Sequence, residues 1–353
     1  MIKKPVKYGK LIRQTIFYLF ITSLVVIILL PVYFLFSLSF MSTREAYEFP
    51  LPMVPSLNIG YSLTHGERGY LLSVYDNFDG EFQTVMDTND VEKMSVYMQY
   101  QLGAPMSIVE IEEQISLLNS GTDPVEFSAR KNLWLNYGTF FRITRDAVPA
   151  LLRSLQIAAL TIIISVTIGG MAGYAFARYA FKGRDTLKFS VLFVRMFPGV
   201  AIALPMVIFL ANLGFYDRPI GLALVYSVGS IALTIWITAS IFLGIPVSLE
   251  EAAVVFGASK FQAFLRITLP LALPGLAAAA MYTFLGAWNE TVSAIILTQF
   301  NPTFSVVVYQ SLLGSVGQVN LAAAGGLVMA LPSVIFTFFI RRYINQMWGG
   351  VTI

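Results

Sequence analysis

The sequence contains no cysteine and a single histidine, His65. The absence of cysteine excludes disulfide bonds, thiolate catalysis and cysteine-ligated metals, and one histidine cannot form a histidine-based metal cluster. The sequence also lacks the G-x-x-x-x-G-K-[ST] pattern that cradles nucleotide phosphates. We therefore expect no metal, no cofactor and no nucleotide site in this chain, and no enzymatic activity of its own.

Charged residues are also scarce. They make up 12% of the 353 residues, whereas hydrophobic residues make up 56%. Because soluble domains contain about 25% charged residues, the composition predicts an integral membrane protein. Residues 41–147 contain fifteen acidic and seven basic residues, and the rest of the chain contains five acidic and sixteen basic ones. This sorting indicates membrane sidedness, and we expect no nucleic-acid partner.

Six hydrophobic segments are long enough to cross a bilayer, which needs about 20 apolar residues. They cover approximately residues 15–40, 151–177, 189–213, 222–243, 271–297 and 321–340. The first is longer than the apolar core of a signal peptide, so we interpret it as a retained span. Thirteen of the sixteen basic residues outside 41–147 fall in predicted inner segments, the exceptions being Arg153, Arg195 and Arg218. The pattern predicts a multi-pass protein of the cell membrane, with both termini in the cytoplasm.

Residues 41–147 are net acidic and follow the first span, so we predict that they are extracytoplasmic. Alternation at 70–75 and 82–86 predicts two strands joined by a turn at 76–80. Residues 108–118 predict a short helix that ends near Gly121. We therefore divide the chain into residues 1–40, an inserted α+β domain at 41–147 and a helical core at 148–353. The insertion either grips a substrate-binding protein or has no role in transport, and the sequence favours neither.

The segment 245–270 contains the longest polar stretch between the later hydrophobic segments. Ser248 and Glu251 have the spacing of a capping box, and Gly257 suits a left-handed helix end. Pro270 is expected to close the segment where the next span begins. Two short helices that meet at a glycine, with apolar side chains outward, predict a surface that fits a cleft on a partner protein.

This segment resembles the EAA signature of importer permeases in the ATP-binding-cassette class. The matching positions are Glu251-Ala252-Ala253, Gly257 and Ile267-x-Leu269-Pro270. Over about residues 10–40 and 132–353 the chain is similar to the maltose-type (MalG-like) branch of sugar-importer permeases. The resemblance implies an all-α, type I membrane fold with six transmembrane helices, in which this loop docks on an ATPase. The residues implied in coupling are Glu250, Glu251, Ala252, Ala253, Gly257, Phe261, Ile267, Leu269 and Pro270.

The resemblance also implies partners: a second, MalF-like permease subunit, two ATPase subunits that bind ATP and Mg²⁺, an extracytoplasmic substrate-binding protein, and membrane lipid. It implies import of a sugar or oligosaccharide. An importer of the same architecture for another solute, such as glycerol phosphate, is an alternative. A secondary transporter would show inverted repeats and mid-membrane carboxylates, for which Glu290 is the one candidate. A membrane-anchored receptor would need neither the EAA loop nor five further spans.

Glu290 is an ionisable residue inside a predicted span, a position typical of residues that face a cavity or another helix. The stretch Trp288-Asn289-Glu290 resembles the W-N-[DE] stretch of related sugar permeases, so these three residues are candidates for lining the pathway. The alternative is a packing or gating role without substrate contact. The cytoplasmic tail 341–353, with Gly349 and Gly350, resembles a tail that inserts between the ATPase subunits, and a frayed terminus is an equal alternative.

Overall fold

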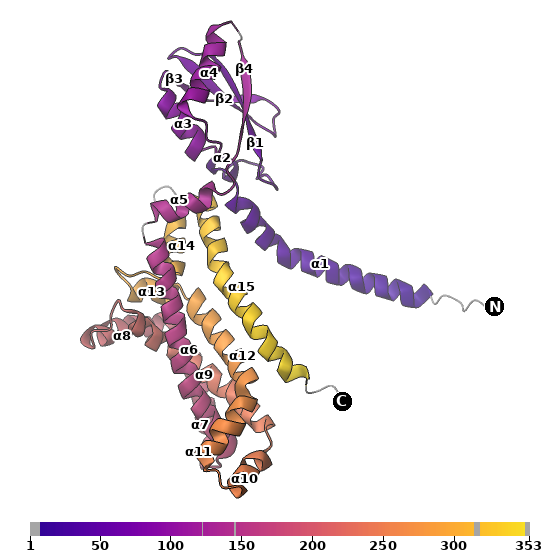
Figure 1. Cartoon of the computed structure of the whole chain (residues 1–353), viewed down its shortest axis with the longest axis vertical. Helices are drawn as coiled ribbons and strands as arrows, with labels where there is room; N and C mark the ends of the chain where they lie inside the picture. The colour runs from indigo at the N-terminus through magenta and orange to yellow at the C-terminus, as the bar shows by residue number, and fades with distance from the viewer. Residues whose placement is uncertain (1–7, 122, 145, 314–317, 350–353) are drawn as a thin grey trace, which may run out of the picture. The chain divides into compact units, whose positions relative to one another are not determined.

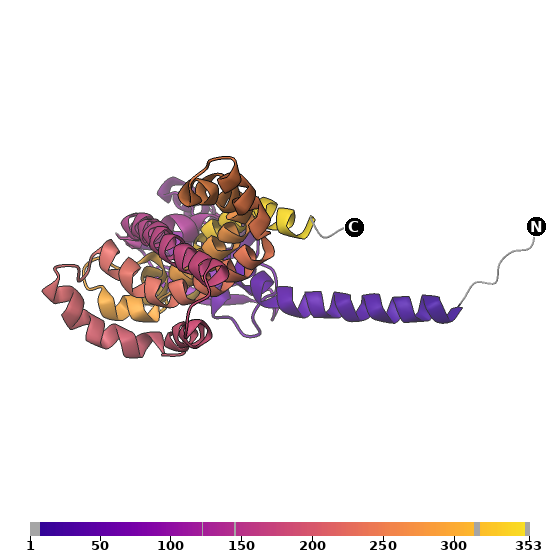
Figure 2. The ribbon, with the colours of Figure 1, turned by 90° about the horizontal axis from the view of Figure 1, so that it is seen from below.

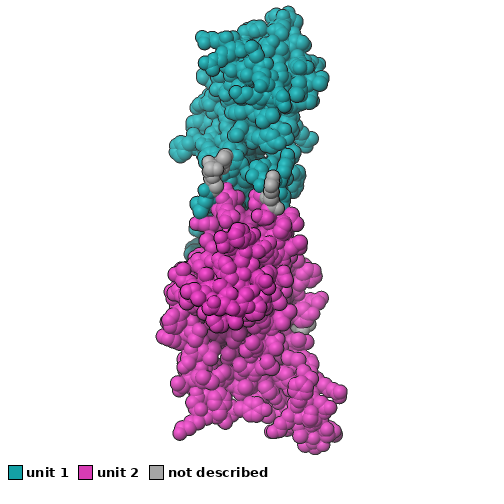
Figure 3. All heavy atoms as spheres, turned by 90° about the vertical axis from the view of Figure 1, so that its left-hand side faces the viewer, with its two compact units in different colours: residues 1–143, 312–327 teal, residues 144–311, 328–353 magenta. Residues whose placement is uncertain are grey.

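The computed structural model describes residues 8–121, 123–144, 146–313 and 318–349. Figure 1 labels its helices and strands. The chain divides into two compact units, which Figure 3 shows in different colours. Unit 1 comprises residues 1–143 and 312–327, and unit 2 comprises residues 144–311 and 328–353. Helix α15 (Val319–Gly349) contributes residues to both units.

Unit 1 begins with α1 (Tyr8–Ser39), one helix that continues through Pro31 (Figures 1 and 2). Its residues from Ile12 onward are apolar enough and numerous enough to cross a membrane. The short helix α2 (Thr43–Ala46) follows, and it is capped by a reciprocal pair of hydrogen bonds between Ser42 and Glu45. Membrane helices tolerate an internal proline when local groups satisfy the freed carbonyl, which explains why Pro31 does not end α1.

The middle of unit 1 is an α+β fold. Its four antiparallel strands lie in the order β3-β2-β1-β4. The predicted hairpin is confirmed, because β2 pairs with β3 and places Tyr75 opposite Phe82. The elements are β1 (Asn58–His65), β2 (Tyr70–Tyr75), β3 (Phe82–Thr88), α3 (Val91–Tyr100), α4 (Ile108–Asn119) and β4 (Val125–Arg130). The predicted helix at 108–118 is likewise present, whereas β1, β4 and α3 were not predicted.

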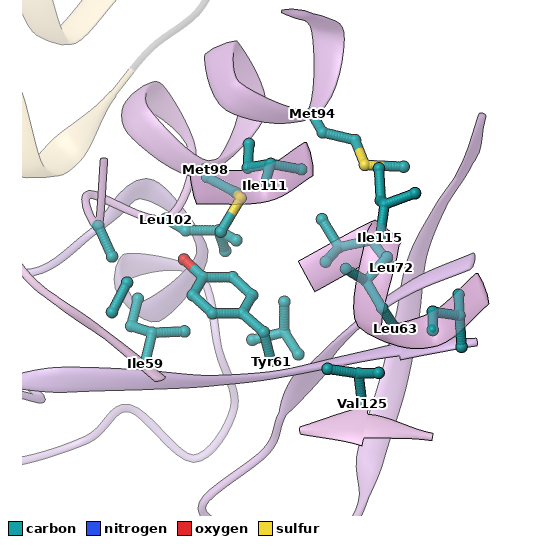
Figure 4. Packing of buried hydrophobic residues seen from close by; sticks show 14 residues of the cluster. Ile59, Tyr61, Leu63, Leu72, Met94, Met98, Leu102, Ile111, Ile115 and Val125 are labelled. Carbon is teal, nitrogen blue, oxygen red and sulfur yellow. The ribbon is translucent and has the colours of Figure 1, made fainter. Parts of the chain in front are cut away.

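The α+β fold has a core between the sheet and its two helices (Figure 4). The ring of Tyr61 rises from β1 among Met98, Leu102 and Ile111, and it is fully buried. Alternate residues of β1 point to this face because strand side chains alternate with a period of two. Large apolar side chains therefore form the interior of this fold.

The end of unit 1 is held by two buried asparagines. Helix α5 (Leu135–Ile143) carries Asn136, whose Nδ2 donates to the carbonyl oxygens of Ser39 (2.8 Å) and Met41 (2.7 Å). Asn320 of α15 donates to the side-chain oxygen of Asn136 at 3.2 Å. These bonds join the end of α1 to α5 and to the first turn of α15, and they satisfy carbonyls that a helix end leaves free.

Unit 2 is built on α6 (Ala147–Arg178), α9 (Pro219–Gly244) and α12 (Leu269–Asn289), which pack on one another. Glycine allows their close approach. A Cβ atom on Gly173 would lie 2.0 Å from Thr238 Oγ1, and one on Gly275 would lie 1.8 Å from Ile241 Cδ1. Small residues at helix crossings are typical of packing in lipid.

The predicted third span at 189–213 is not one straight helix. The structure has α7 (Arg184–Val194) and α8 (Gly199–Asn212), bent by 86° relative to each other. Pro198 occupies the N-cap position of α8. Because proline lacks an N–H and disfavours helical backbone in the residue before it, the helix is interrupted at this point. Among the described residues, five helices are long and apolar enough to cross a membrane, or six if this bent pair counts as one span.

The predicted fifth span at 271–297 is also interrupted. Helix α12 ends at Asn289, and α13 (Val292–Leu297) and α14 (Phe304–Leu313) follow. The connection after α13 is tied to the rest of unit 2, since Arg153 Nη1 donates to the carbonyl of Pro302 at 2.6 Å. This bond fixes the turn that contains Pro302 to the first part of α6.

Candidate functional site

The segment 245–270 forms two short helices, as predicted. Helix α10 (Val247–Val255) is followed by a turn in which Gly257 has a φ of 91°. Helix α11 (Lys260–Ala263) then leads into a π-helical turn, η1 (Phe264–Thr268). The left-handed backbone at Gly257 confirms the role predicted for this glycine, because residues with a Cβ disfavour that region.

Two local predictions for this segment are wrong. Ser248 and Glu251 form no capping box, because α10 starts at Val247 after Pro246 and Ser248 already lies inside the helix. The capping box is formed instead by Ser259 and Gln262 at the start of α11. Pro270 does not close the segment either, since η1 continues directly into α12. The wide π turn before Pro270 accommodates a residue that cannot donate the usual helical hydrogen bond.

The tip of the segment exposes large apolar side chains. Phe256 is 92% exposed, and Val255 and Phe261 are also strongly exposed. Of the other predicted coupling residues, Glu251, Ala252 and Pro270 are exposed, whereas Ala253, Ile267 and Leu269 are partly buried. We call Val255, Phe256 and Phe261 the tip cluster. Because these residues are adjacent and apolar, they form a surface suited to burial against a protein partner.

Glu250 does not share this exposure. Its carboxylate is 13% exposed and forms an ion pair with Arg178, at 2.7 Å between Nε and Oε1. Its oxygens also accept hydrogen bonds from Thr268 Oγ1 (2.7 Å) and Tyr174 OH (2.8 Å). The resemblance implies a role for Glu250 in coupling to an ATPase, and the structure directs its carboxylate to α6 and η1. Burial raises its pKa, and the hydrogen bonds from Thr268, Arg178 and Tyr174 more than reverse this, so the net pKa is lowered.

Arg178 extends the same network to a third helix. Its two Nη atoms donate to the carbonyls of Phe242 (2.7 Å) and Ile245 (3.0 Å), at the end of α9. The carbonyls at a helix end have no intrahelical partner, and a cation there is favourable. The network therefore fixes α10 to α6, to the end of α9 and to η1, which continues into α12. From the sequence, Arg178 is one of the thirteen basic residues of the predicted inner segments and nothing more, because its partners lie more than sixty residues away.

A second site is a cavity of about 270 Å³ inside unit 2. Arg195 at the end of α7, Tyr226 of α9 and Glu290 after α12 contribute its charged and phenolic groups. Glu290 Oε1 accepts from the backbone N–H of Ser293 at 2.8 Å. The Tyr226 hydroxyl is buried and has no hydrogen-bond partner among the residues that the structure describes. The remaining polar lining is formed by Ser230, Tyr282, Thr283 and Ser293.

Of the three residues predicted to line the pathway, the structure brings only Glu290 to this cavity. Trp288 is buried, stacks on Phe284 and donates its indole N–H to the carbonyl of Met329 at 2.9 Å. Asn289 is exposed at the end of α12. Gly349 is the last residue of α15, and Gly350 lies outside the described residues, so the predicted contact of the tail with an ATPase stays a prediction.

Comparison with known proteins identifies the family. Residues 165–348, more than half of the chain, match the model of the binding-protein-dependent transport system inner membrane component. The trehalose transport system permease SugB of Mycobacterium tuberculosis is 34% identical over 205 residues, which cover 55% of this chain and 73% of that protein. The trehalose/maltose permease MalG of Thermococcus litoralis is 32% identical over 201 residues, covering 56% and 72%. The chain therefore belongs to the family of inner membrane permeases of binding-protein-dependent ABC importers, and it is a multi-pass membrane protein.

Solved structures support the same fold. A bacterial ABC transporter involved in the import of the acidic polysaccharide alginate contains a chain with a TM-score of 0.57 and 16% identity, covering 96% of this chain and 99% of that one. The MetNI methionine ABC transporter, in inward-facing conformations, gives a TM-score of 0.50 and 19% identity, covering 58% and 97%. At these identities the likeness concerns the fold.

Proposed function

We propose that this chain forms one half of the transmembrane pathway of an ATP-driven importer for a sugar or oligosaccharide. The observation that carries the proposal is the segment 245–270, which presents the apolar tip cluster outward while Glu250 ties it to α6 and, through Arg178, to the end of α9. A surface that docks on a moving partner transmits force only if it is fixed to the helices that must move.

In this mechanism, ATP binding closes two partner ATPase subunits, which carry the two coupling segments of the permease pair toward each other. The packed helices of unit 2 follow as a rigid body and alternate between inward-open and outward-open states. The chain itself makes and breaks no covalent bond. ATP and Mg²⁺ belong to the ATPase subunits, and a second permease completes the pathway.

The proposed topology has six spans, with α7 and α8 as one broken span, and both termini in the cytoplasm. Residues 41–147 are then extracytoplasmic, where a substrate-binding protein delivers the solute. The concentration of acidic residues in this region and of basic residues in the predicted inner segments supports this orientation.

The names of relatives that transport trehalose and maltose support a sugar as substrate. The cavity adds a chemical reason, because its lining includes Glu290 together with the hydroxyl residues Ser230, Thr283 and Ser293. Side chains that can donate and accept hydrogen bonds suit the hydroxyl groups of a polyol. Arg195 in the same lining favours a second candidate, an anionic solute such as glycerol phosphate.

The tip cluster can be tested by co-purification of the complex from native membranes. We expect Phe256→Asp to release the ATPase subunits while the second permease is retained, because a charge replaces the most exposed apolar side chain of the cluster. The matched control is Phe300→Asp, which changes another strongly exposed phenylalanine, one that follows α13 in unit 2. Retention of the ATPase in both variants would show that the tip cluster is not the docking surface.

A second experiment separates docking from force transmission by comparing two adjacent glutamates. Glu250→Gln should leave the ATPase bound but weaken the coupling of ATP hydrolysis to uptake, since it removes the charge that binds Arg178. Glu251→Gln leaves the network intact, because Glu251 is exposed, so any loss that it causes should appear as release of the ATPase and not as a lower uptake per ATP hydrolysed. Equal effects of the two substitutions on uptake per ATP hydrolysed would contradict the role assigned to the network.

The solute is tested by uptake into proteoliposomes that contain the complete transporter. If the substrate is a sugar, Glu290→Gln should change its uptake kinetics and Arg195→Gln should change them less. If the substrate is anionic, Arg195→Gln should have the larger effect, and on an anionic solute only. Unchanged kinetics in both variants would remove the cavity from the pathway.

A further inference from the structure

The chain between α2 and β1, residues 47–57, is unusually apolar for a segment of a water-exposed domain. Phe49 is 95% exposed, Val54 is 66% exposed, and Met53 and Leu57 are also largely exposed. Glu48 is the only charged residue of the eleven. We call this segment the apolar loop. Large exposed apolar patches on a soluble surface mark a site that another molecule covers.

The position of the apolar loop is fixed by α1. The carbonyl of Met53 accepts hydrogen bonds from Tyr33 OH and Ser37 Oγ, both at 2.8 Å. Because a helix rises 1.5 Å per residue, Tyr33 lies about 9 Å before the end of α1 at Ser39. The loop therefore leaves α2, folds back along the last two turns of the hydrophobic span, and then returns to the sheet.

An open cavity of about 370 Å³ lies between these parts of the chain. Its walls are almost entirely apolar or aromatic and come from α1, the apolar loop and the residues before α5: Tyr33, Phe36, Ser37, Phe40, Val54, Pro55, Leu133 and Trp134. The two hydroxyls among them are already bonded to Met53. The cavity consequently offers an occupant apolar contact, with the amphipathic ring of Trp134 at its rim and 68% exposed.

The surface of α1 indicates whether lipid or a protein occupies this cavity. Its large apolar side chains from Ile12 to Phe36 are exposed in a helix of membrane-spanning length, and such a surface suits lipid. The apolar loop and the cavity continue the same surface at the end of the span. Tyrosine and tryptophan are enriched at the level of the lipid headgroups, and the loop lacks the charged rim of a typical protein interface.

We propose that the apolar loop inserts into the outer leaflet and that the cavity holds part of an outer-leaflet phospholipid acyl chain. This rests on the proposed topology, in which the end of α1 faces outward. The apolar loop then anchors the inserted α+β fold at the membrane surface, so that the fold cannot turn freely about the end of α1.

The natural absence of cysteine allows a direct test. The complete transporter is placed in phosphatidylcholine–phosphatidylglycerol nanodiscs, and single variants Val54→Cys, Phe78→Cys and Leu29→Cys are labelled with an environment-sensitive maleimide fluorophore. Phospholipids that carry a nitroxide near the headgroup then quench any label at that depth. Phe78 matches Val54 in exposure and lies on the β2–β3 turn of the same fold, and Leu29 lies within the span.

We expect the Val54→Cys label to be quenched several-fold more strongly than the Phe78→Cys label. Equal, weak quenching of both, with Leu29→Cys quenched by deeper nitroxides, would overturn the proposal and leave the topology intact. A Val54→Cys label that is shielded from aqueous iodide but not quenched by lipid would show that a protein covers the loop, which also overturns it. An unquenched Leu29→Cys label would instead contradict the membrane span itself, and with it the proposed topology.

Discussion

The α+β fold of unit 1 and the helical bundle of unit 2 form their interiors from different side chains. The first buries large residues, among them Tyr61, Leu72 and Met94. In the second, many of the buried positions are alanine or glycine, and helices approach until a Cβ on Gly173 would overlap Thr238.

The difference reflects the solvent on the outside of each part. In water, the transfer of apolar area out of solvent stabilises a core by about 25 cal/mol per Å², so large side chains contribute most. Lipid tails are as apolar as leucine, so helices in a bilayer gain little from that transfer and depend on close contact. The two parts of the chain are therefore stabilised in different ways: the α+β fold by burial of large apolar side chains, and the helical bundle by close contact between helices. Substitutions in each part can test this difference.

The largest effect is expected for Gly173→Leu. The new side chain would have to occupy the space of Thr238 and of the Ala239 backbone N, 2.0 and 2.9 Å from the first added carbon. We expect a loss above about 4 kcal/mol, the range in which a variant no longer folds, seen as loss of monodisperse protein in detergent. Gly244→Leu, where a Cβ meets nothing within 4 Å, is the control. Equal yields of both variants would contradict close packing between α6 and α9.

The next effect concerns the ion pair of Glu45 and Lys131, buried in unit 1. Glu45→Gln leaves the lysine without its charge partner, which costs about 3–5 kcal/mol for a buried pair. Hydrogen exchange of the β1 and β4 amides in the full-length protein measures this loss, with the exposed Glu67→Gln as control. An unchanged exchange rate in Glu45→Gln would show that the pair is neutral for stability.

The same variant has a defined pH dependence. Burial raises the pKa of Glu45. The charge and hydrogen bond of Lys131 and the hydrogen bonds from Ser56 and Ser42 lower this pKa by more than burial raises it, so the net pKa is lowered. Stability from this group is therefore present above the unfolded-state pKa of about 4.3 and lost as pH falls through the lower folded-state pKa. The difference between wild type and Glu45→Gln should shrink on acidification, and a difference that grows would reverse the assigned sign.

The third expected effect is a loss of stability in the core of the α+β fold, which two neighbouring leucines can test. Leu72 is buried against the helices, whereas Leu71 points to the other face of β2 and is partly exposed. Leu72→Ala should destabilise the fold by about 2–5 kcal/mol, and Leu71→Ala clearly less, both measured by hydrogen exchange of residues 58–130. Similar losses from the two variants would mean that the sheet is covered on both faces.

The sequence predicted features that depend on local signals. The hairpin of β2 and β3 follows from alternation on both sides of a short turn, and the left-handed turn needs only Gly257. The positions of α1, α6, α9 and α15 follow from long apolar segments, because a bilayer sets a minimum length.

Features that depend on distant partners were missed. Strand β4 pairs with β1 across more than fifty residues of chain, and its pairing therefore leaves no local signal. Strand β1 was missed although Gly66 and Gly69 lie in the turn that joins it to β2. The break at Pro198 was missed, because the long apolar segment 189–213 indicated one continuous span. The internal contacts of Glu250 were missed because its partners, Tyr174, Arg178 and Thr268, are far away in sequence.

The smallest loss of stability is expected from a change to the carboxylate of Asp217, a polar contact in unit 2. It accepts the backbone N–H groups of Gln299 (3.0 Å), Phe300 (3.1 Å) and Asn301 (3.1 Å), and its own φ is 57°. Asparagine tolerates this left-handed backbone, so Asp217→Asn removes the charge and places an amide donor opposite N–H donors.

We expect Asp217→Asn to cost about 1–3 kcal/mol, the penalty of unsatisfied donors, as faster hydrogen exchange at residues 299–301 alone. Asp185→Asn, at an exposed carboxylate of the same unit, is the control. The loss should stay below that of Glu45→Gln, because the donors of Asp217 lie on exposed backbone that water can reach. A loss as large as that of Glu45→Gln, or one that spreads into α9, would mean that a single polar contact supports unit 2, and close helix packing would then not be its main source of stability.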